Sequence, residues 1–183
     1  MKRLVTTRLP SPGVLTAIAA IALVGGLAAC TVKKETRACP KVEVVGDLSR
    51  KAQFADGPGR DLSDILYVAR IADVKSGCTY DKRGVTVDMV VSIVGERSRA
   101  GAKLKGADIT YFVAITDAQE SIIGKQTFTS RLDFTADNPR IDDELDQIIP
   151  LSSPRATAAD HTIIVGLQLT PEQIDFNQKP RRD

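Results

Sequence analysis

Apolar and polar residues alternate along much of the chain after Cys39, and this period of two predicts β-strands. The clearest alternation covers three segments, residues 85–94, 109–116 and 125–134. In the last of these, Phe128, Leu132 and Phe134 share one face, while charged and hydroxyl side chains occupy the other. A strand with this pattern buries one face and exposes the other to water. We therefore expect three half-buried strands.

Other segments carry strand patterns of a different kind. Residues 65–74 are apolar on both faces apart from Arg70 and Asp73, which indicates a more central strand. Val42 and Val44 suggest a short strand before it. Two more candidates follow later in the chain, a clear one at residues 161–169 and a weaker one at residues 145–151. Proline near the end of the weaker candidate would confine it to the edge of a sheet.

Turn and capping residues connect these segments. Residues 81–84 place aspartate first and glycine fourth, as a type I turn prefers, and residues 117–124 can close a second hairpin. Near the end, Thr170 is followed by proline and then by Gln173 three positions on. This is a capping box with proline at the first helical position, and it predicts a short helix over residues 171–177.

About seven strands, two hairpins and one short C-terminal helix favour an antiparallel immunoglobulin-like β-sandwich, with a small β-barrel as the alternative. Residues 39–183 are enough for one domain with a real core. Two polar stretches rich in loop-forming residues, 46–62 and 135–143, are expected to be mobile surface loops.

The first 29 residues have the pattern of a secretory signal. Basic residues at Lys2, Arg3 and Arg8 precede an uncharged, mostly apolar run over residues 14–27. That run is shorter than the roughly 20 apolar residues of a membrane-spanning helix. It ends in Leu27-Ala28-Ala29-Cys30, which resembles the lipobox of bacterial lipoproteins.

This resemblance implies cleavage before Cys30, a diacylglyceryl group on its thiol and acylation of the new amine. Residues 30–38 would then form a lipidated tether to the domain. In such lipoproteins an aspartate after the lipidated cysteine signals retention in the inner membrane. Thr31 stands at that position. We therefore expect a lipid anchor in the outer membrane, with the domain facing the periplasm.

The expected cleavage changes the charge of the chain. The signal holds three of the 25 basic residues and none of the 23 acidic ones, so the mature chain has 22 basic and 23 acidic residues and a formal charge of −1. Nucleic-acid binding requires a basic face. Near-neutral charge and export both argue against a nucleic-acid partner.

Two cysteines remain besides Cys30. Disulfides persist outside the cytoplasm, so we predict that Cys39 and Cys78 are bonded to each other. A redox or metal role is the rival interpretation, but the chain has no C-x-x-C spacing and one histidine.

Residues that could carry chemistry are few, and we expect neither catalytic residues nor a cofactor. His161 is the sole histidine, no G-x-S-x-G motif occurs, and Ser121 and Lys125 are four positions apart rather than three. One acidic cluster could bind a hard cation on a flexible loop. It consists of Asp137, Asp142, Asp143, Glu144 and Asp146. Its spacing does not fit an EF-hand, and we expect a solvated loop without metal.

Surface recognition is the class of function that remains. We expect an accessory or structural module that binds another envelope component, with contacts at the edge near residues 145–151 and at residues 46–62. The alternative is a carrier of a small ligand or lipid, with an apolar cavity between its sheets. A hydrolase acting on cell-wall or lipid substrates is a third possibility, for which the chain supplies no recognisable catalytic set.

Overall fold

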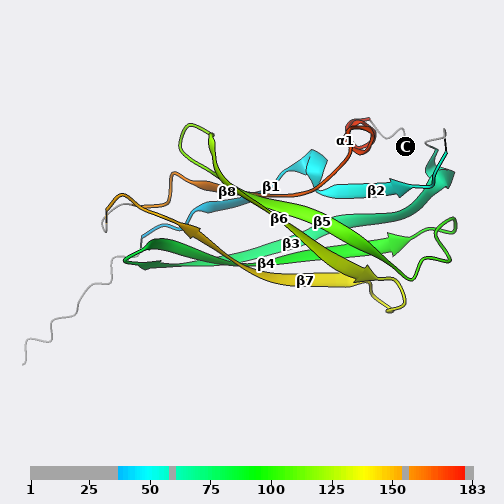
Figure 1. The fold of residues 1–183 in the computed structure, drawn as a ribbon, viewed down its shortest axis with the longest axis horizontal. Coiled ribbons are helices and arrows are strands. Elements are labelled where there is room, and N and C mark those ends of the chain that lie inside the picture. The colour runs from blue at the N-terminus through cyan, green and yellow to red at the C-terminus, as the bar shows by residue number, and fades with distance from the viewer. Residues whose placement is uncertain (1–36, 58–60, 154–156, 180–183) are drawn as a thin grey trace, which may run out of the picture. The chain divides into compact units, whose positions relative to one another are not determined.

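Two four-stranded sheets pack face to face in this protein (Figure 1). The structure is a computed structural model that describes residues 37–57, 61–153 and 157–179. The predicted signal and Cys30 lie outside these residues. No helix within the described ranges is both long and apolar enough to cross a membrane.

The first sheet has the strand order β1-β8-β5-β6, and the second has the order β2-β3-β4-β7. The first sheet consists of β1 (Lys41–Val44), β8 (Thr162–Leu167), β5 (Gly106–Thr116) and β6 (Ile122–Asp133). The second consists of β2 (Arg50–Phe54), β3 (Ile65–Asp81), β4 (Gly84–Arg97) and β7 (Arg140–Ile149). Two single-turn 3-10 helices (Gly46–Leu48 and Leu62–Asp64) and α1 (Pro171–Gln178) complete the fold. All neighbouring strands are antiparallel except β1 and β8.

The predicted β-sandwich is confirmed, with eight strands rather than about seven. The two sheets stay separate among the described strands, so the alternative of a small barrel is not what the chain forms. The likeness to an immunoglobulin domain is one of architecture, because a constant immunoglobulin domain has the strand orders ABED and CFG.

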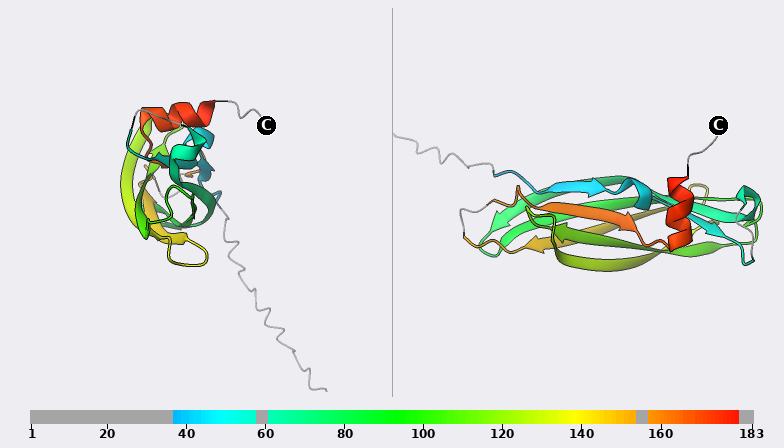
Figure 2. Two further views of the ribbon diagram at one scale, coloured as in Figure 1. Left: turned by 90° about the vertical axis from the view of Figure 1, so that its right-hand side faces the viewer. Right: turned by 90° about the horizontal axis from the view of Figure 1, so that it is seen from above.

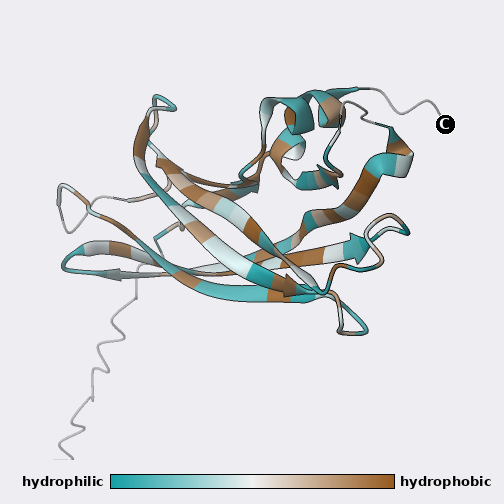
Figure 3. Ribbon diagram, turned by 45° about the vertical axis from the view of Figure 1, so that its right-hand side comes forward, coloured by the Kyte–Doolittle hydropathy of each residue, from teal (hydrophilic) through white to brown (hydrophobic). Residues whose placement is uncertain are grey.

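Alternating side chains from both sheets form the core, as the sequence pattern predicts. Fully buried residues include Val85, Val91 and Ile93 on β4 and Tyr111 and Val113 on β5. Figure 3 shows the apolar bands interrupted by polar ones along the strands. Each apolar face is therefore covered by the opposite sheet, which is the main favourable contribution to folding.

Both predicted hairpins are present. Asp81 pairs with Gly84 across the β3–β4 turn, and the Asp81 carboxylate accepts a hydrogen bond from the Arg83 backbone N–H at 2.7 Å. The glycine is required here, because its φ of +137° is rarely adopted by other residues and a Cβ would lie 2.2 Å from the Ile149 carbonyl oxygen.

The two predicted surface loops are loops only in part. Residues 46–62 contain β2, which pairs with β3, and residues 135–143 run into β7, which begins at Arg140. The apolar side chains of β2, Ala52 and Phe54, pack in a small cluster of their own with Phe176 of α1. A strand that is buried by a helix rather than by the opposite sheet shows no long alternation in its sequence.

The predicted C-terminal helix is confirmed as α1, which packs across β2, crosswise to the strands (Figure 2). Thr170 and Gln173 form the predicted capping box. The Gln173 amide also donates to the Ala52 carbonyl oxygen at 3.0 Å, and the Asn177 amide donates to the Arg50 carbonyl oxygen at 2.7 Å. The helix therefore supplies hydrogen-bond partners to an edge strand that would otherwise be open.

The predicted disulfide is also present. The sulfur atoms of Cys39 and Cys78 are 2.01 Å apart, and the bond joins the chain just before β1 to the last third of β3. The Tyr80 hydroxyl donates to the Ala38 carbonyl oxygen, and the Arg37 guanidinium lies 4.0 Å from the centre of the Tyr80 ring. These contacts fix the place at which the described chain enters the sandwich.

Candidate functional site

The residues considered for catalysis are engaged in separate contacts. The Lys125 ammonium lies 4.5 Å from the centre of the Phe112 ring, whereas the Ser121 backbone N–H donates to the Asp117 carboxylate. His161 immediately precedes β8 and is partly buried, as predicted. Its Nδ1 atom is buried and has no hydrogen-bond partner among the described residues. Within the described part of the chain, none of these three side chains is hydrogen-bonded to another of the three.

The acidic cluster does not form the flexible loop that the sequence suggested. Four of its residues lie on β7, where successive side chains point to opposite faces. Asp143 faces the core and accepts a hydrogen bond from the Tyr111 hydroxyl at 2.7 Å and another from Ser130. Asp142 faces outward and forms an ion pair with Arg140 at 2.7 Å. The described residues contain no group of three or more side chains placed to hold a metal ion.

Hydrogen bonds account for the charge state of the outward carboxylate. Donation from Arg140, and secondly from the Ser92 hydroxyl, holds the pKa of Asp142 below its ordinary value. Ser92 is buried beneath this pair, and the Arg140 guanidinium donates to its hydroxyl oxygen at 2.8 Å. This part of the cluster is thus a local structural network on the outer face of the second sheet.

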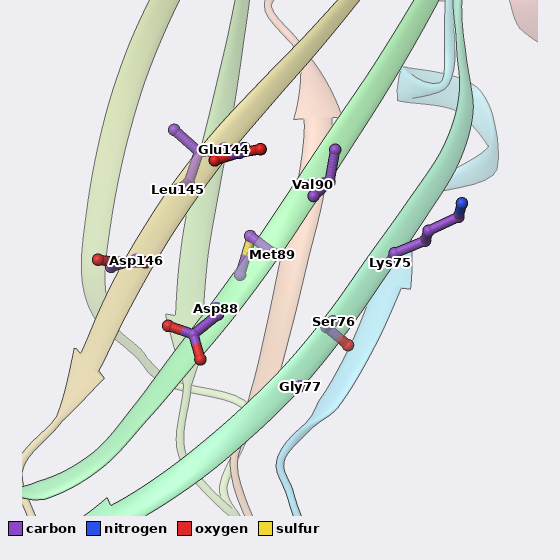
Figure 4. A pocket seen from close by; sticks show the side chains of 9 residues that line it. All are labelled: Lys75, Ser76, Gly77, Asp88, Met89, Val90, Glu144, Leu145 and Asp146. Atoms are coloured by element: carbon purple, nitrogen blue, oxygen red, sulfur yellow. The ribbon is translucent and has the colours of Figure 1, made fainter.

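A shallow hollow of about 390 Å³ lies next to this network on the same face (Figure 4). Asp88 of β4 stands directly opposite Asp146 of β7, and Glu144 adds a third carboxylate. Lys75 on β3 is the one basic side chain in its lining. The outer face of the sheet is therefore acidic along β7, which is its edge strand.

The two edges named from the sequence differ in their accessibility. The edge at residues 46–62 is partly covered, because α1 packs on β2. By contrast, β7 is the terminal strand of the second sheet and β6 is the terminal strand of the first. Gln126 of β6 and Gln147 of β7 are hydrogen-bonded at 3.3 Å. The two free edges therefore lie side by side at that point.

Beyond this bond the two edges enclose a groove of about 520 Å³, here called the β6–β7 groove. Its lining consists of Ile115, Ile123, Gly124, Lys125, Gln126, Asp146, Gln147, Ile148, Ile149 and Pro150. Ile123 and Ile148 are 52% and 48% exposed, which is high for isoleucine. The predicted edge at residues 145–151 thus forms one wall. The other wall was missed, because Ile123 falls in a segment interpreted as a turn.

Comparisons with known proteins found no relative, so a proposal for the function rests on this geometry. No protein-family model matches the chain, and neither the curated proteins nor the solved structures contain a significant match.

Proposed function

We propose that this protein is a membrane-anchored periplasmic lipoprotein that acts as an accessory binding module. Its β6–β7 groove would accept an extended segment of another envelope protein. The observation that carries this proposal is the meeting of two terminal strands around exposed isoleucines.

Strand addition is the binding mode that suits this groove. A terminal strand presents backbone N–H and C=O groups along its outer side, and an extended peptide can pair with them. Apolar side chains of the peptide would pack against Ile123 and Ile148. Basic side chains would suit the outer face of β7, where Glu144 and Asp146 are exposed.

The anchor in this proposal rests on the motif that ends at Cys30. Thr31 after the cysteine supports the outer membrane over the inner one, and the near-neutral mature chain supports a protein partner over a nucleic acid. The short tether would keep the domain close to the membrane surface that bears the anchor.

Site-specific crosslinking in cells tests the groove directly. A photoreactive amino acid would replace Ile148 in the full lipidated chain, and a matched control would replace Leu62. Leu62 is 71% exposed and lies outside the groove. We expect a discrete crosslinked envelope protein from position 148 and none from position 62. The Ile148→Asp variant should lose this partner in detergent pull-downs while keeping its thermal unfolding transition.

The carrier function is the second candidate, because four isoleucines line the groove and could contact an acyl chain. Recovery of the purified protein with stoichiometric lipid and without a crosslinked protein would support the carrier. Crosslinking that is equal at positions 148 and 62 would remove the groove from both proposals.

A further inference from the structure

We propose that the end of the sandwich at which the chain enters contacts the lipid bilayer, with Ile122 entering the interface between headgroups and acyl chains. This inference rests on the lipid anchor of the proposed function and adds the orientation of the domain. We call this end the entry end and define it by Ala38, Lys41 and Tyr80.

The place of entry is fixed by covalent and polar contacts. The disulfide of Cys39 and the hydrogen bond from Tyr80 to Ala38 hold the chain against the end of β3. Cys30 precedes Arg37 by seven residues. Seven residues span at most about 25 Å when fully extended. A lipid on Cys30 would therefore keep the entry end close to the membrane.

Strand register places Ile122 at the same end. Lys41, the first residue of β1, pairs with Thr162, Thr162 pairs with Thr116, and Thr116 pairs with Ile122. These four residues form one row across the first sheet. Strand spacing of about 4.8 Å puts Ile122 roughly 14 Å from Lys41 across the row. The β5–β6 turn, residues 117–121, extends beyond this row.

The entry end carries exposed apolar side chains. Six large apolar side chains of the described residues are noticeably exposed, and Ile122, Ile123 and Ile148 are three of them. Ile122 is 64% exposed, whereas Ile123 and Ile148 line the β6–β7 groove. An isoleucine exposed to this extent is less favourable in water than at a lipid interface. Ile122 thus offers a membrane contact that is separable from the groove.

Charges at this end are close to balance, so apolar contact would dominate. Its basic residues are Arg37, Lys41, Lys82 and Arg83, and its acidic residues are Asp81, Asp117, Glu120 and Asp160. Attraction to anionic lipids needs a clear excess of basic residues near the surface. We therefore expect the contact to form on zwitterionic lipid and to persist at high salt.

The chain has no tryptophan, so a single introduced tryptophan reports its own surroundings. We would compare Ile122→Trp with Leu62→Trp in the full lipidated protein on phosphatidylcholine vesicles with brominated acyl chains. Leu62 is also apolar and is 71% exposed. It lies at the opposite end of the sandwich, because the 17 residues of β3 run from there to the entry end. The fluorescence of the Ile122→Trp protein should shift to the blue and be quenched by the bromine atoms, because the side chain would lie at the acyl boundary. The Leu62→Trp protein should show neither change.

Hydrogen exchange on the unsubstituted protein provides a second measurement. Vesicles should slow exchange in residues 117–122 and leave the segment around Leu62 unchanged. A protein that floats with vesicles but shows equal emission and exchange at both positions overturns the bilayer contact alone. A protein that does not float overturns the anchor as well. A crosslinked protein partner at position 122, without quenching, would assign the surface to that partner and also overturn this inference.

Discussion

Tyr111 shows how one polar group shapes the core of this sandwich. Its ring is fully buried and stacks on Phe128 with centroids 5.4 Å apart, and its hydroxyl donates to Asp143. Burial, and secondly the carboxylate of Asp143, raises the pKa of Tyr111 well above its ordinary value. The protonated phenol is therefore the form that the fold stabilises.

The Tyr111→Phe variant should be less stable by about 1–2 kcal/mol at pH 8, because it keeps the ring packing and loses the hydrogen bond. The unfolded phenol ionises near pH 10, below the folded one, so this stabilisation is present below pH 10 and declines above it. The difference in unfolding free energy between the two proteins should shrink from pH 9 to pH 11. Ser130→Ala is the control, since it weakens the same cluster without a titrating ring. A difference that stays constant over this range would contradict the prediction.

Two glycines on β3 and β4 provide a matched pair at the same scale. A methyl group at Gly84 would meet the Ile149 carbonyl oxygen at 2.2 Å in a conformation that alanine rarely adopts. Gly77 has an ordinary φ, and a methyl group there would meet no atom within 4 Å. We expect Gly84→Ala to lower the unfolding free energy by at least about 2 kcal/mol. Gly77→Ala should leave it unchanged or raise it by up to about 1 kcal/mol. Urea unfolding of both variants measures these changes in unfolding free energy. Equal changes in the two variants would contradict the prediction.

At the scale of elements, the sequence pattern predicted those strands whose inner face is apolar throughout. The strand β4 is the clearest case, because Val85, Val91 and Ile93 all face the opposite sheet. The strand β7 was recognised only in part, because its inner face includes Asp143 and Gln147, whose partners come from distant strands. Such partners cannot be inferred from local alternation.

The same limit applies to the candidate site. Residues 145–151 could be identified as an edge from Pro150, which directly follows β7. The opposing wall depends on how β6 lies beside β7, and no local feature of Ile123 reveals that. Likewise, nothing near Ala52 in the sequence indicates that Gln173 would bind its carbonyl oxygen. Contacts between strands far apart in the chain require the assembled sandwich.

Helix α1 should act as a cover for β2, and the Gln173→Ala/Phe176→Ala double variant tests this role. It removes the hydrogen bond to Ala52 and the contact between Phe176 and Phe54, whose ring centroids are 5.2 Å apart. An uncovered edge strand is a template for pairing with another chain. We expect faster hydrogen exchange in β2 and concentration-dependent dimers in light scattering. Asp175→Ala, on the exposed side of α1, is the control and should do neither.

At the scale of the molecule, the disulfide joins the chain that carries the tether to the second sheet, while β1 itself belongs to the first sheet. Without the disulfide, the residues before β1 are no longer covalently attached to the second sheet. The tether would then gain the residues up to β1, and the domain could tilt more freely relative to any anchor at Cys30.

The Cys39→Ser/Cys78→Ser variant should lose about 4 kcal/mol of unfolding free energy, since the bond spans 39 residues and limits the unfolded chain. Reduction of the wild-type protein should lower its unfolding midpoint to that of the variant, because both then lack the same constraint. Urea unfolding with and without reductant measures both effects. A loss below about 1 kcal/mol would contradict the prediction, because it would mean that the bond hardly limits the unfolded chain. The pairing of β1 with β8 does not involve the bond and would remain in the variant.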